Sequence, residues 1–269
     1  MLNSESTPAR HRPERRPTAI GAVLLLWALV ACAPGPAPAP SGSSSAETAA
    51  PIDTQSPPTS LPIDIDSPVA DAPVTIPVSV RGTAGAPDTA LVVDLLDEDG
   101  QTLCVRNLTA AAAAAAAASG AGGAWHTDLA FSPPDAEQPV TLRAYELSAE
   151  DGSATNVSER PLTLTPERPP VIITSPACGA SIAAGGVLEV SGRAMVPEGQ
   201  FTVELRDSAG APVLTEQVTA ASGSEESDFS VTLPVPAGIA AGYYDLVGFD
   251  NSLKDGSVQY EFPVQLVLQ

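Results

Sequence analysis

Apolar and polar residues alternate along most of the chain, and this alternation predicts β-strands. Apolar residues recur at every second position in three clear runs: Val74, Ile76, Val78 and Val80; Phe201, Val203 and Leu205; and Tyr260, Phe262, Val264, Leu266 and Leu268. Since successive side chains of a strand point to opposite faces, each run has one face for a core. Pro77 and Pro263 occupy outward-facing positions within two of the runs. Because proline cannot donate to a strand ladder, we expect their strands at sheet edges.

The alternating region is a tandem duplication. Residues 78–104 and 188–214 align without a gap, and eight of their 27 positions are identical. Glycine, aspartate and proline turns separate the strands at the spacing of an antiparallel sandwich with about seven strands per 100 residues. The chain is therefore expected to be all-β, with one sandwich over residues 61–166 and a second over 170–269.

The second copy carries a series of marks in a fixed order. They are Ser175-Pro176, Val190-Ser191-Gly192-Arg193-Ala194, Glu198-Gly199, Asp207 to Gly210, Phe229 and Asp255-Gly256-Ser257. In this order they resemble the immunoglobulin-like domain of bacterial spore-germination and sporulation proteins, which is often found beside GerMN domains. The first copy resembles it more loosely, with Asp88-Thr89 in place of Glu-Gly. The resemblance implies tandem immunoglobulin-like sandwiches in a non-enzymatic envelope protein, and it names no ligand.

A short apolar run precedes the duplicated region and ends at a cysteine. Residues 1–18 are polar with clustered arginines, and residues 19–31 are apolar. This run is short for a membrane span and suits a secretory signal. It ends in Leu29-Val30-Ala31-Cys32, which resembles the lipobox of bacterial lipoproteins. The resemblance implies that residues 1–31 are removed and that Cys32 carries a diacylglyceryl anchor at the extracytoplasmic face of the cell membrane. The alternative is an ordinary signal peptide with an incidental cysteine.

Composition narrows the function further. Residues 32–60 are rich in proline, alanine and serine and have no apolar periodicity, so we expect a tether. The net charge of -20 disfavours binding to nucleic acid or anionic lipid head groups. The chain has only two histidines, which argues against histidine-based triads and multi-histidine metal sites. We therefore predict no catalytic residues, no metal site and no cofactor.

Two features could carry chemistry and have a plainer explanation. The acidic stretch Asp97 to Gly100 could be a calcium loop or a hairpin turn. The second copy keeps the glycine and loses two of the acidic residues, which favours the turn. The alanine run 110–118 interrupts the first copy and is interpreted as a loop expansion, either transiently helical or disordered.

Cys104 and Cys178 lie in different copies at non-equivalent positions. In an exported protein they could form a disulfide that links the two domains, and two free or buried thiols are the alternative.

Four residues, Trp125, His126, Tyr243 and Tyr244, are candidates for contact with a ligand or partner. Trp125 aligns with Phe229, so we expect a core residue, with His126 facing outward alone. Tyr243 and Tyr244 are the candidates for an exposed partner contact, and one of the two is expected in the core.

The sequence predicts a lipid-anchored binding or scaffolding protein of the bacterial envelope, with an envelope protein as its partner and a link to sporulation, germination or cell-wall processes. The alternative is a carbohydrate- or wall-binding accessory lipoprotein. That alternative calls for several exposed aromatic side chains, and the chain has 5 Phe, 4 Tyr and 2 Trp.

Overall fold

The computed structural model describes residues 62–84, 90–108, 123–148, 150–252 and 254–269. The predicted signal peptide (1–31), Cys32, the tether (32–60) and the alanine run (110–118) lie outside these residues. The described chain is built almost entirely of strands, with a single 3-10 turn at Pro197–Gly199. No helix within the described part is long and apolar enough to span a membrane.

The first copy forms two antiparallel-rich sheets. A three-stranded sheet has the order β1-β3-β6, and a five-stranded sheet has the order β2-β8-β7-β4-β5. The strand bounds are β1 Asp64–Ser67, β2 Pro73–Val74, β3 Val78–Ala84, β4 Leu91–Leu96, β5 Thr102–Leu108, β6 Gly123–Leu129, β7 Gln138–Leu147 and β8 Ala154–Leu164.

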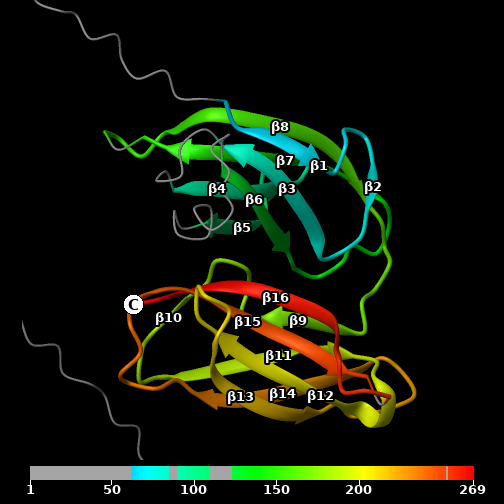
Figure 1. Cartoon of the computed structure of the whole chain (residues 1–269). Helices are drawn as coiled ribbons and strands as arrows, with labels where there is room; N and C mark the ends of the chain where they lie inside the picture. The colour runs from blue at the N-terminus through cyan, green and yellow to red at the C-terminus, as the bar shows by residue number, and fades with distance from the viewer. Residues whose placement is uncertain (1–61, 85–89, 109–122, 149, 253) are drawn as a thin grey trace, which may run out of the picture. The chain divides into compact units, whose positions relative to one another are not determined.

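The second copy repeats this topology strand for strand (Figure 1). Its sheets have the orders β14-β11-β9 and β10-β16-β15-β12-β13. The bounds are β9 Val171–Ser175, β10 Ser181–Ile182, β11 Val187–Ala194, β12 Gln200–Arg206, β13 Pro212–Thr219, β14 Ser227–Pro234, β15 Gly242–Asn251 and β16 Val258–Leu268. In both copies one short strand pairs in parallel with the last strand, β2 with β8 and β10 with β16. The all-β prediction with two tandem sandwiches is confirmed.

In each sandwich a glycine packs closely against an aromatic ring of the neighbouring strand. Gly82 of β3 lies opposite Trp125 of β6, and Gly192 of β11 lies opposite Phe229 of β14. A methyl group at either glycine would overlap both the ring and a backbone carbonyl of the neighbouring strand. The glycine and the aromatic residue of the repeat are therefore one packing unit. Trp125 is 5% exposed, so its predicted place in the core is confirmed.

The Asp-Gly-Ser mark closes the last hairpin of each sandwich. The Asp151 Oδ1 accepts hydrogen bonds from the backbone N–H and the hydroxyl of Ser153, at 3.0 and 2.7 Å. Asp255 does the same with Ser257, at 3.2 and 2.8 Å. These bonds to the ionised form lower the pKa of both carboxyls. The aspartate of the motif is thus hydrogen-bonded within the turn itself.

Two details of the strand predictions are wrong. The run from Val74 to Val80 is divided between β2 and β3, and Pro77 lies just before β3. The strand that follows Pro77 is central, between β1 and β6, because a proline before the first ladder residue leaves no hydrogen bond unmade. The predicted edge position holds locally for Pro263. It lies in the part of β16 that pairs with β15, whereas β10 reaches only Val267 and Leu268.

Candidate functional site: the joint between the two sandwiches

The two sandwiches belong to one compact unit, Gln55–Gln269. Strand β5 of the first sandwich forms a disulfide and several hydrogen bonds to the second. This strand is the edge of the five-stranded sheet in the first copy. Cys104 of β5 is joined by a disulfide to Cys178, which follows β9 of the second copy. The bond links residues 74 positions apart, with their Cα atoms 5.2 Å from each other.

An ion pair lies beside the disulfide. The Arg106 guanidinium donates from Nη2 to both carboxylate oxygens of Asp245 in β15, at 2.8 and 2.9 Å, and from Nη1 to the Pro263 carbonyl of β16 at 3.3 Å. The Arg106 side chain is only 8% exposed, against 31% for Asp245. A buried cation needs such partners because burial removes its hydration.

The backbone of β5 also bonds to the second sandwich. The Asn107 N–H donates to Gln265 Oε1 at 2.6 Å, and the Gln265 side-chain amide donates back to the Asn107 carbonyl at 3.0 Å. Gln265 is 5% exposed. An edge strand with open N–H and C=O groups invites pairing with other chains. One glutamine therefore caps this part of the edge of β5.

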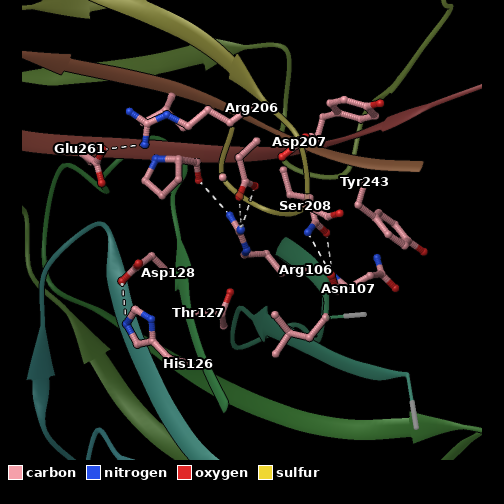
Figure 2. Close-up of a pocket in the computed structure, with 17 residues that line it drawn as sticks. Arg106, Asn107, His126, Thr127, Asp128, Arg206, Asp207, Ser208, Tyr243 and Glu261 are labelled. Atoms are coloured by element: carbon pink, nitrogen blue, oxygen red, sulfur yellow. Dashed lines mark hydrogen bonds and ion pairs between the residues drawn. The ribbon is translucent and has the colours of Figure 1, made fainter. Parts of the chain in front are cut away.

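A cavity of about 290 Å³ lies at this joint, between β5 and β6 of the first sandwich and the β15–β16 face of the second (Figure 2). The lining includes Arg106, Thr127, Tyr243 and Glu261.

The two tyrosines predicted as partner contacts differ in their surroundings. Tyr244 is 8% exposed, and its hydroxyl donates to the Ala240 carbonyl at 3.0 Å. Tyr243 is half-buried and lines the cavity, so neither tyrosine is a fully exposed contact.

Among the described residues, the exposed aromatic side chain is that of Tyr260, which the alternation predicts in the core. Its side chain is 60% exposed because its backbone is in the left-handed region, with φ of 55°, where the β15–β16 register shifts after Gly248. The equivalent residue of the first copy, Asn156, has φ of 52°. Asparagine adopts this conformation readily, and a bulky residue rarely does. A bulge turns one side chain out of an alternating run, and alternation alone cannot show it.

His126 faces outward as predicted, but it is not alone. Its ring Nε2 lies 3.1 Å from the Ser79 hydroxyl and 3.7 Å from a carboxylate oxygen of Asp128. About half of its side chain is exposed.

The acidic stretch at 97–100 forms a turn. The Asp97 Oδ1 accepts from the N–H groups of Asp99 and Gln101, at 3.0 and 2.7 Å, and Asp207 repeats this pattern in the second copy. Gly100 has φ of 76°, which explains the retained glycine. Among the described residues, no group of three or more His, Cys, Asp or Glu side chains could hold a metal ion.

The segment between the sandwiches is fixed to the second one by charge. Arg168 donates to Glu226 at 2.5 and 3.0 Å, and Arg193 lies 2.9 Å from the same carboxylate. The hydrogen bonds from Arg168 lower the pKa of Glu226 below its ordinary value of 4.5. The depressed pKa means that this contribution to stability is present above pH 4.5 and is lost as the pH falls through the folded-state pKa.

Replacing Glu226 with glutamine should lower the free energy of unfolding at pH 7 by about 0.5–1 kcal/mol, because the group is partly exposed. It should also flatten the decline in stability below pH 4.5. Urea unfolding followed by circular dichroism between pH 3 and 7 measures both. Glu225→Gln, at the exposed neighbour, is the control and should match the unsubstituted chain. Equal pH profiles for the two variants would contradict the role of Glu226.

The family comparison agrees with this architecture. The family described as an immunoglobulin-like domain of bacterial spore germination matches residues 62–153 and 170–257, more than half of the chain. The chain belongs to this family. Each match of the germination-type domain falls on one sandwich. Immunoglobulin-like domains of such a family fit a non-catalytic binding or scaffolding role.

No curated protein is significantly similar to the chain. The solved structures that are similar to the chain have low sequence identity to it. The fibronectin(III)-like modules of Clostridium thermocellum CbhA are 11% identical, with 77% of this chain and 94% of that chain covered and a TM-score of 0.24. The E. coli chaperone DraB is 12% identical, with 75% and 97% covered and a TM-score of 0.26. Such likenesses say nothing about ligand or partner.

Proposed function

We propose that this chain is a lipid-anchored, non-catalytic binding or scaffolding protein of the bacterial envelope. The observation that carries the proposal is the tetrapeptide Leu29-Val30-Ala31-Cys32 after an apolar run, placed before two sandwiches of a spore-germination family. Diacylglyceryl on Cys32 would hold the protein at the extracytoplasmic face of the membrane. Two acyl chains anchor stably, whereas one is marginal.

The partner proposed for this protein is another envelope protein, within sporulation, germination or wall processes. The family description supports this setting. The net charge of -20 favours basic or cation-bearing partners and disfavours polyanions. On the second sandwich, Tyr260 and Val258 of β16 are 60% and 48% exposed. They are the most suitable residues in that hairpin for an apolar contact with such a protein.

Replacing Cys32 with serine should release the chain from the membrane fraction and abolish its labelling by an alkyne fatty acid. Ser41→Ala, in the predicted tether, is the control and should leave both unchanged. Cross-linking of the same cells tests the binding role, since only the anchored chain should cross-link to an envelope protein. A Cys32→Ser chain that is still labelled and still sediments with membranes would refute the anchor.

A further inference from the structure

The cavity at the joint contains polar groups in positions where packing would call for apolar ones. Arg106 shares its strand face with buried Cys104 and Leu108, and Thr127 shares its face with buried Trp125 and Leu129. At the equivalent place in the second copy, β14 carries Val231 where β6 carries Thr127. The polar pair therefore belongs to the first sandwich alone, where β5 and β6 border the cavity.

Both residues carry an atom without a partner. Arg106 is 7% exposed and Thr127 is 4% exposed. The Arg106 Nε and the Thr127 Oγ1 are buried and form no hydrogen bond within the described part of the molecule. Figure 2 shows the Thr127 hydroxyl on the side of the residue that faces Arg106. Buried polar atoms are nearly always satisfied. Among the described residues there are three exceptions; Trp125 Nε1 belongs to a residue outside the lining, whereas Arg106 and Thr127 both line one cavity, which indicates a missing partner there.

The charges of the lining limit the chemistry of that partner. Arg106 is already paired with Asp245, and Arg206 is paired with Glu204 and Glu261 at 2.7 Å each. An anion would therefore meet cations that already have carboxylate partners. The remaining polar groups of the lining include the hydroxyls of Thr127, Ser208 and Tyr243, the side-chain amide of Asn107 and the carboxylates of Asp128 and Asp207, which accept hydrogen bonds. Such a set suits a neutral ligand rich in hydroxyl groups.

We propose that this cavity binds one ring of a neutral oligosaccharide. A ring hydroxyl would give the Arg106 Nε and the Thr127 Oγ1 their partner, and the half-buried Tyr243 ring would pack against the apolar face of the sugar. The volume of about 290 Å³ is near the lower end for ligand pockets, which suits one ring with the remainder of the ligand outside. This inference depends on neither the lipid anchor nor the protein partner proposed above.

The test is calorimetric titration of the full chain in detergent with chitotetraose, cellotetraose and maltotetraose, and with tetragalacturonate as an anionic probe. At least one neutral probe should bind saturably. Tyr243→Ala should weaken that binding at least tenfold, and Thr127→Val about fivefold, the loss expected for one hydrogen bond. Val187→Ala, at an exposed residue of β11 outside the cavity, is the control and should bind as the unsubstituted chain does.

Thermal unfolding without ligand distinguishes a role of the Thr127 hydroxyl in ligand binding from a role in the stability of the fold. Because that hydroxyl has no partner, Thr127→Val should leave Tm unchanged or raised while binding is weakened. The proposal is overturned if none of the neutral probes binds, if only tetragalacturonate binds, or if binding is unaffected in Tyr243→Ala.

Discussion

Replacing Gly192 with alanine is expected to destabilise the second sandwich by about 3 kcal/mol, the largest effect we predict for a single added methyl group. The new Cβ would overlap the Ile172 carbonyl and lie 2.8 Å from the Phe229 ring. Neither can move freely, because Ile172 belongs to β9 in the same sheet and Phe229 packs edge-on against Phe201 at 4.8 Å. Interiors at native density have no room for such a shift.

Gly238→Ala is the matched control, since no atom beyond its two chain neighbours lies within 4 Å of a Cβ built there and its backbone is not in the left-handed region. Its effect should stay within about 0.5 kcal/mol. Urea unfolding of both variants, with hydrogen exchange of the β11 and β14 amides, locates the loss. If both variants show the same exchange rates in β11, the close packing at Gly192 does not determine the stability of the second sandwich.

Replacing Arg106 with methionine should destabilise the joint by about 2 kcal/mol. Loss of one partner of a buried ion pair typically costs about 3–5 kcal/mol, and the 31% exposure of Asp245 reduces this because water can solvate the remaining carboxylate. The disulfide between Cys104 and Cys178 would still link the sandwiches, so we expect looser docking without separation.

A double-mutant cycle measures this coupling. Arg106→Met combined with Asp245→Asn should be less destabilised than the sum of the single changes, by at least about 1 kcal/mol. Arg81→Met is the control, because Arg81 is exposed on β3 and forms no ion pair with any residue that the structure describes. Additive effects of the two changes at the joint would show that the ion pair does not couple the sandwiches.

The sequence by itself determined the class of the fold and its duplication. Strand faces repeat every two residues, so alternation marked the core side of β3, β12 and most of β16 from local information. The duplication gave more information than the alternation, because residues shared by the two copies mark positions that the fold requires. The repeat aligned Gly82 with Gly192 and Trp125 with Phe229. In the structure, the glycine and the aromatic residue of each copy pack against each other. The turn at Asp97 followed from the same comparison.

Only the tertiary structure decided the joint, the cavity and the exposed aromatic residue. Arg106 and Asp245 are 139 positions apart in different copies, and the residue of β13 aligned with Arg106 is Glu216. The repeat therefore offered no precedent for the pair. Tyr260 leaves the core face through a left-handed residue at a register shift, which alternation does not encode. Local periodicity specifies which face of a strand is buried, whereas contacts between domains depend on which edges and faces meet after folding.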